Sequence, residues 1–201
     1  MSVVVDAGPL LALSKLGLLW ILPRLYESVL VPSAVHEEVV LQGLARGYPD
    51  ASVVQQAILR EELTTIPVGD EELLENVRSL PLGRGKKHVI HLGLVTSPRW
   101  VLMDDYLARE EAMHLGLRVK GTVGVIIHAY RQGIIGLKEV ELAFQTIIDR
   151  PDIWIAAAFV RRVWEALRAE QIPLAVGIGL AGYAFVTVAT DGAGVITPSV
   201  S

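Results

Sequence analysis

The sequence contains no cysteine, and its 18 basic residues are outnumbered by 22 acidic ones in a chain of 201 residues. Without cysteine the chain has no disulfide and no thiolate metal site, which suits a reducing compartment. The formal net charge of -4 excludes a global positive field that would draw the protein onto nucleic acid. Any binding of a polyanion must therefore depend on a local patch of cations.

A secretion signal is also lacking at the start of the sequence. No basic region precedes an apolar stretch there, and Asp6 interrupts the opening apolar run. We therefore expect a cytoplasmic protein.

Charged residues are missing from 172–190, a stretch that just reaches membrane-spanning length. Pro173, three glycines and a β-branched run favour an irregular or strand-forming tail over a membrane helix. We expect one domain at 1–169 and an apolar Gly/Ala-rich tail at 170–201, without a membrane anchor.

The opening run Val3-Val4-Val5 ends in Asp6 and is apolar on both faces, as a central strand of a parallel sheet requires. Further strands are expected at 28–31, 63–66, 100–103 and 118–120. Helices are expected between and after them, among them 70–80, 86–95 and 152–169. This alternation predicts an α/β fold with a mainly parallel sheet.

Acidic residues stand at three predicted strand ends or helix starts, namely Asp6, Glu38 and the pair Asp104-Asp105. Ligands bind beyond the carboxyl ends of parallel strands, so these side chains can meet at one edge. Two carboxylates about 4 Å apart repel by about 4 kcal/mol at an effective dielectric of about 20, so a cluster needs a cation or a proton. A hard ion such as Mg²⁺ would suit it and could activate water. The alternative is that each acid only caps a helix.

Five segments together resemble the PIN-domain family, and most closely its subgroup of toxin-like prokaryotic ribonucleases. The segments are VVVDAGPLLALSKLG (3–17), VLVPSAVHEEV (29–39), LGRGKKHVIHLGL (82–94), VLMDDYLAREEAMHLGL (101–117) and VKGTVGVIIHAYRQGII (119–135). The resemblance covers residues 2–168 in order, which makes it more specific than any one motif.

The resemblance implies a three-layer α/β/α sandwich and metal-dependent cleavage of RNA, with Mg²⁺ or Mn²⁺ as cofactor. It also implies a homodimer and an antitoxin protein as partner. Asp6 matches the first acid of the family, Glu38 the second, and Asp104 with Asp105 the last. These four are the predicted catalytic and metal-binding residues.

Two positions depart from this pattern, because Lys86 and His88 stand where such relatives usually carry glutamates. His88 matches the third acid of the metal cluster. Imidazole in place of carboxylate weakens Mg²⁺ binding and favours Mn²⁺ or a softer ion, so His88 is a predicted substitute ligand. Lys86 could instead pair with a carboxylate and make the metal unnecessary. Residues two apart on a helix point in different directions, so we do not expect both at the cluster.

Several cations near these acids could contact RNA phosphates, although an ordinary solvated face is the alternative. Thr122 begins a helix, whose free N–H groups could receive a phosphate; the alternative is that Thr122 only caps the helix. The predicted RNA-binding residues are Arg84, Lys86, Lys87, Arg109 and Thr122, with Arg99 close by.

The leading hypothesis is thus a PIN-type metal-dependent ribonuclease. The main alternative is a catalytically degenerate PIN-like domain that binds RNA or a protein. A phosphotransfer receiver domain fits less well, since it would need a phosphoacceptor at an internal strand end and a later lysine.

Overall fold

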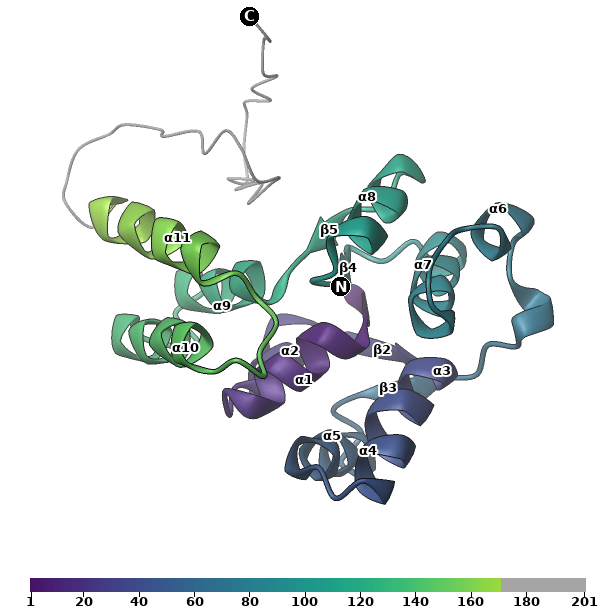
Figure 1. Cartoon of the computed structure of the whole chain (residues 1–201), viewed down its shortest axis with the longest axis horizontal. Helices are drawn as coiled ribbons and strands as arrows, with labels where there is room; N and C mark the ends of the chain where they lie inside the picture. The colour runs from purple at the N-terminus through teal and green to yellow at the C-terminus, as the bar shows by residue number, and fades with distance from the viewer. Residues whose placement is uncertain (171–201) are drawn as a thin grey trace, which may run out of the picture.

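A computed structural model describes residues 1–170 of the chain, built around a parallel sheet (Figure 1). Its strands are β1 (Ser2–Val5), β2 (Ser28–Pro32), β3 (Thr64–Ile66), β4 (Trp100–Leu102) and β5 (Val119–Lys120). Their order is β3-β2-β1-β4-β5, and every neighbouring pair is parallel. All five strands agree with the sequence-based prediction to within about a residue at each end.

Helices surround this sheet. They are α1 (Ala7–Lys15), α2 (Leu22–Leu25), α3 (Ser33–His36), α4 (Gln42–Ala45), α5 (Pro49–Leu59), α6 (Glu75–Arg78), α7 (Arg84–Thr96), α8 (Tyr106–His114), α9 (Thr122–Arg131), α10 (Leu137–Asp149) and α11 (Ala157–Glu170). Three short turns of other helical types complete the description: η1 (Leu19–Ile21), η2 (Glu37–Leu41) and η3 (Asp70–Glu72).

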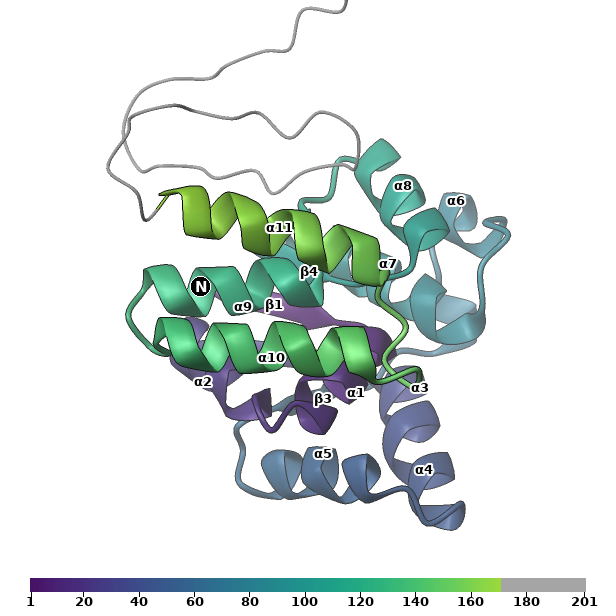
Figure 2. The same ribbon diagram turned by 60° about the vertical axis from the view of Figure 1, so that its left-hand side comes forward.

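The helices form a layer on each side of the sheet. Helix α7 packs against β1, β2 and β4 on one side, while α1 and α9 pack together on the other. Helices α10 and α11 stack beyond α9, as Figure 2 shows. Val3, Val4 and Val5 are fully buried because both faces of β1 are covered. The predicted three-layer α/β/α sandwich is thereby confirmed.

The strand order places a topological switch point beside β1. From β1 the chain moves outward to β2 and β3, then returns across the sheet to β4 on the other flank of β1. Ligands in such sheets bind beyond the carboxyl ends of the strands at this point. Asp6 follows β1 directly and Asp104 lies two residues beyond β4, so both lie at the switch point.

Two predicted helices differ from the observed structure. The stretch 70–80 is broken into η3 and α6, because Leu73 and Leu74 adopt extended ψ angles of 130° and 141°. The backbone N–H of Leu74 then donates to Nδ1 of His91 at 3.3 Å instead of to a helical carbonyl. The last helix begins at Ala157 rather than near Asp152, whose carboxylate pairs with Arg150.

The predicted apolar tail lies outside the described residues. Within residues 1–170, no single helix is long and apolar enough to cross a membrane. The pair Ala7–Lys15 and Leu19–Leu25 satisfies length and composition only when the two are combined, and they are bent by 117°.

Candidate functional site

Asp6 is the most deeply buried of the predicted acids. Its backbone N–H donates to the carbonyl of Leu102 at 2.9 Å, which fixes the end of β1 against β4. Asp6 stands at the N-cap position of α1, but its side chain makes no capping hydrogen bond. Helix capping, the alternative left open by the sequence, therefore does not explain this residue.

The electrostatic surroundings of Asp6 identify its neighbours. Burial raises the pKa of Asp6 to about 6, and the ammonium group of Lys86 opposes that rise. The carboxylates of Glu38 and Asp104 raise the pKa of Asp6 further. Because a charge shifts a pKa only at short range, Glu38 and Asp104 both lie near Asp6.

Glu38 lies in η2, a π-helical segment that joins α3 to α4. Segments of this kind are rare and occur often at functional sites. A Cβ atom on Gly85 would lie 3.0 Å from Oε2 of Glu38, so the start of α7 approaches the glutamate closely. The neighbouring Glu37 accepts a hydrogen bond from Arg84 at 2.6 Å, which ties η2 to α7 while Glu38 forms no salt bridge with a described residue.

Asp104 is held by the first residue of α9. The backbone N–H of Thr122 donates to Oδ1 at 2.7 Å, and the Thr122 hydroxyl donates to Oδ2 at 2.6 Å. Burial raises the pKa of Asp104, and these two hydrogen bonds and the charge of Arg109 counteract the rise. Thr122 is fully buried, so in this structure it orients Asp104 and offers no open phosphate contact.

Asp105 has a different environment from its neighbour. Its Oδ1 accepts a hydrogen bond from the backbone N–H of Ala108 at 2.9 Å, so it caps α8. Its Oδ2 lies 3.9 Å from Nζ of Lys86. The helix-capping alternative therefore describes Asp105, while Asp6, Glu38 and Asp104 form the acidic rim.

His88 does not join the acidic rim, which corrects the prediction that it replaces a metal ligand there. Its ring is fully buried, and Nε2 lies 2.7 Å from Oδ1 of Asp70 in η3. Hydrogen bonds to His88 and Arg84 lower the pKa of Asp70. Positions 86 and 88 are two residues apart on α7, so they point in different directions, and the side chain that faces the rim is Lys86.

The predicted RNA-binding cations are mostly engaged with other groups. Arg84 binds Asp70 and Glu37, and Nζ of Lys87 donates to the carbonyl of Arg78 at 2.7 Å. Arg109 donates to the carbonyl of Met103 at 3.1 Å beside the rim. These residues therefore do not gather into the open patch that the sequence suggested.

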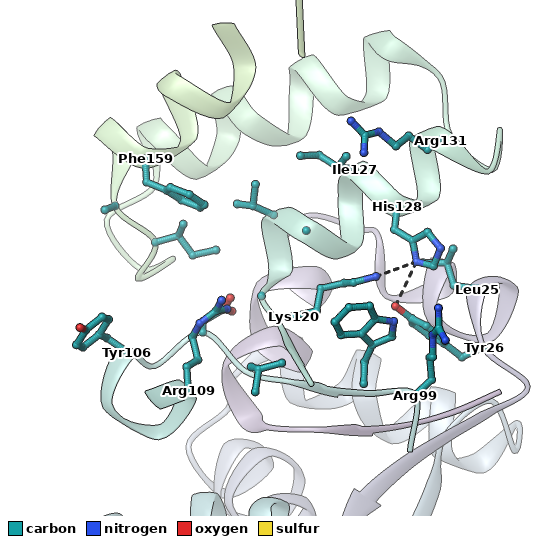
Figure 3. Close-up of a pocket in the computed structure, with 18 of the residues that line it drawn as sticks. Leu25, Tyr26, Arg99, Tyr106, Arg109, Lys120, Ile127, His128, Arg131 and Phe159 are labelled. Carbon is teal, nitrogen blue, oxygen red and sulfur yellow. Dashed lines mark hydrogen bonds between the residues drawn. The ribbon is translucent and has the colours of Figure 1, made fainter. Parts of the chain in front are cut away.

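A different cationic group surrounds Trp100 at the start of β4. The guanidinium carbon of Arg118 lies 4.6 Å from the ring centroid, and Nζ of Lys120 lies 4.3 Å from it. Lys120 also lies 3.2 Å from Nδ1 of His128, and Arg99 borders the same space (Figure 3). Arg118 and Lys120 were missed in the sequence. The signal in the sequence was a pair of cations on both sides of Val119, together with Arg99 directly before the strand that begins at Trp100.

The acidic rim offers oxygen donors to a divalent ion without forming a closed site. No three His, Asp or Glu side chains within residues 1–170 are arranged as a ready metal site. Asp6 and Glu38 form no salt bridge with the described residues and so provide free oxygens, Thr122 orients Asp104, and Lys86 adds a positive charge. Mg²⁺ is commonly held by one or two carboxylates, with waters and substrate phosphates as the other ligands. The rim fits an ion bound in that way, and not one held in a preformed cage.

An α/β/α fold with acids gathered at its switch point is compatible with a nuclease-type class of protein. Residues 2–169 match the family described as PIN domain, and the chain belongs to that family. Neither the curated proteins nor the solved structures include a match. PIN domains are generally nucleases that act on RNA with divalent metal ions. The toxin-like subgroup predicted from the sequence stays a prediction.

Proposed function

We propose that this chain is a metal-dependent ribonuclease that hydrolyses phosphodiester bonds at the rim formed by Asp6, Glu38 and Asp104. The observation that supports this most strongly is that Asp6 and Asp104 both lie at the switch point, where the charges of Glu38 and Asp104 raise the pKa of Asp6. Like charges gathered around a half-enclosed edge favour binding of a cation.

The side chains have separate tasks in this proposal. Asp6 and Glu38 would hold the ion, and Asp104, fixed by Thr122, would complete its ligands from the side of α9. A bound divalent ion lowers the pKa of water and neutralises phosphate charge. Asp105 caps α8 and so fixes the backbone between Asp104 and the start of this helix.

Lys86 sets the strength of ion binding in this site. Its ammonium is the strongest influence on Asp6 after burial, and it approaches Asp105 at 3.9 Å. A fixed positive charge among the ligands repels a divalent cation, so we expect weak binding of Mg²⁺ and a requirement for high concentrations of Mg²⁺ or Mn²⁺.

The same lysine favours a second candidate function, a PIN domain that binds RNA or a protein without cleaving RNA. In that case Lys86 would balance the rim permanently and no ion would be needed. The two functions differ in one measurable property, which is cleavage.

The deciding experiment measures cleavage of a single-stranded RNA by the purified chain with Mg²⁺ or Mn²⁺. We expect slow cleavage in the native protein, none in Asp6→Asn, and faster cleavage in Lys86→Glu, because a carboxylate replaces the opposing charge. Lys87→Glu is the matched control, since Lys87 bonds to Arg78 and lies outside the rim. Absence of cleavage by both native protein and Lys86→Glu, with each shown to unfold cooperatively, would leave the binding function.

The homodimer and the antitoxin partner belong to the same proposal. Sedimentation of the purified chain would test the dimer. A short DNA-binding reading frame beside the gene would support a toxin–antitoxin pair.

A further inference from the structure

A cavity of about 1380 Å³ opens beside Asp104. Its lining comes from β4, β5, α8, α9 and α11. Figure 3 shows Tyr106 and Arg109 toward one end of this space and Lys120, His128, Tyr26 and Arg99 toward the other. The cavity thus leads away from the acidic rim along the edge of the sheet.

The lining of the cavity is cationic although the whole chain is acidic. Arg24, Arg99, Arg109, Lys120, Arg131 and Arg162 line it, against the acids Asp104, Glu110 and Glu170. Glu170 is paired with Arg131, and Glu110 accepts a hydrogen bond from Tyr106. No carboxylate among residues 1–170 forms a salt bridge with Arg99, Arg118 or Lys120.

These unneutralised cations repel one another. Burial lowers the pKa of Lys120 to about 8, and the charges of Arg99 and Arg118 lower it further. Burial lowers the pKa of His128 to about 4, with contributions from Lys120 and Arg99. A bound anion would relieve this repulsion, as occurs when phosphates replace counterions on a basic protein surface.

Aromatic rings at the cavity are unusually exposed. The side chain of Trp154 is 92% exposed and that of Tyr106 is 65% exposed, and both line the cavity. Phe159 lies along the wall formed by α11. Cations that follow a groove with exposed rings alongside are the usual arrangement for binding a single strand, because phosphates pair with the cations and bases stack on the rings.

We propose that this cavity is a channel for single-stranded RNA, in which Arg99 and Lys120 bind phosphates and Trp154 and Tyr106 stack on bases. A strand held there continues to the rim at Asp104. The proposal rests on the proposed function only in naming RNA as the strand. Lys120 is half-buried, so an extended strand reaches it while a duplex does not.

The test is binding of a fluorescein-labelled oligouridylate of about 12 nucleotides, followed by anisotropy in EDTA, so that cleavage is not required. The full chain carrying Arg99→Ala and Lys120→Gln should bind about tenfold or more weakly. Its plot of log affinity against log salt should flatten by about 1.4, for two lost phosphate contacts. The control, Arg46→Ala with Arg60→Ala, removes the same charge at exposed sites outside the cavity and should bind as the native chain does.

A second variant tests stacking without disturbing the fold. Trp154→Ala removes a ring that is almost fully exposed, and it should weaken RNA binding by about five- to 100-fold. Its control is Tyr48→Ala, an exposed ring before α5 and outside the cavity.

Three results would overturn the channel. They are equal losses in the cavity variants and their controls, equal effects on single-stranded and duplex RNA, and tighter binding of a polyglutamate peptide than of RNA. Cleavage with unchanged binding in the cavity variants would reject the channel and keep the nuclease. Cavity-dependent binding without cleavage would reject the nuclease and keep the channel.

Discussion

Position 86 decides the character of the site more than any other residue. The sequence shows Lys86 and His88 as two departures from the expected acids, with His88 as the missing ligand. In the structure the buried His88 ring contacts Asp70, and Lys86 lies beside Asp6 and Asp105. Chemically, the change at the rim is therefore the gain of a tethered positive charge.

Asp6 should reduce stability while it serves function. Its folded-state pKa of about 6 exceeds the ordinary value of 3.8, so the folded chain binds the proton more tightly than the unfolded chain. The contribution of Asp6 to the free energy of unfolding is therefore most favourable below about pH 4 and falls as the pH rises to about 6. Asp6→Asn should raise the free energy of unfolding by up to about 3 kcal/mol at pH 7.5, and by less at pH 5.

Urea unfolding in EDTA at the two pH values measures this effect. Glu62→Gln, which alters a carboxylate away from the rim, is the control. If Asp6→Asn is less stable than the native chain at pH 7.5, the surroundings of Asp6 stabilise its charged form, and the prediction is wrong.

At the scale of elements, the close approach of helix α7 to the sheet positions Lys86 beside the acidic rim. A Cβ atom on Gly93 would lie 2.9 Å from Cγ2 of Val101 and 3.1 Å from Cδ1 of Leu117. Gly93→Ala should therefore lower the free energy of unfolding by about 1–3 kcal/mol, despite the better helix propensity of alanine.

Gly83→Ala is the matched control for this prediction. Gly83 precedes the same helix with a φ of -65°, and no atom lies within 4 Å of the added Cβ. Denaturant titration should find it near native stability. Equal effects of the two substitutions would mean that α7 can move away from β4 without lowering the free energy of unfolding.

The strands were predictable because β1 and β4 are continuous apolar runs bounded by acids or turn residues, and the local sequence carries that signal. The break between η3 and α6 was not, because it depends on a hydrogen bond from Leu74 to the distant His91. The gathering of Asp6, Glu38 and Asp104 followed from the parallel topology. The cationic group around Trp100 did not, since it joins β4 and β5, which are separated in the sequence by α8.

At the scale of the whole molecule, ion binding should appear as thermal stabilisation. A ligand that binds only the folded state raises stability by an amount set by its concentration relative to Kd. With Mn²⁺ at about 100 times the Kd of the variant, Lys86→Glu should gain about 2–3 kcal/mol, or roughly 4–12 °C in Tm. The native chain should gain far less at the same concentration.

Differential scanning calorimetry with and without Mn²⁺ measures this shift independently of RNA cleavage. Lys87→Glu carries the same change in net charge one residue away and should follow the native chain. Equal shifts in both variants would mean that Mn²⁺ responds to overall charge and not to the rim.

The strand order also determines how the protein could be divided. Residues 1–80 carry β1, β2 and β3 with Asp6 and Glu38, and residues 84–170 carry α7, β4 and β5 with Lys86 and Asp104. Each half exposes an unpaired strand edge that the other completes, β1 in the first and β4 in the second. A chain cut between α6 and α7 would therefore restore its full set of acids only when the two fragments reassociate, which makes this position suited to a split reporter.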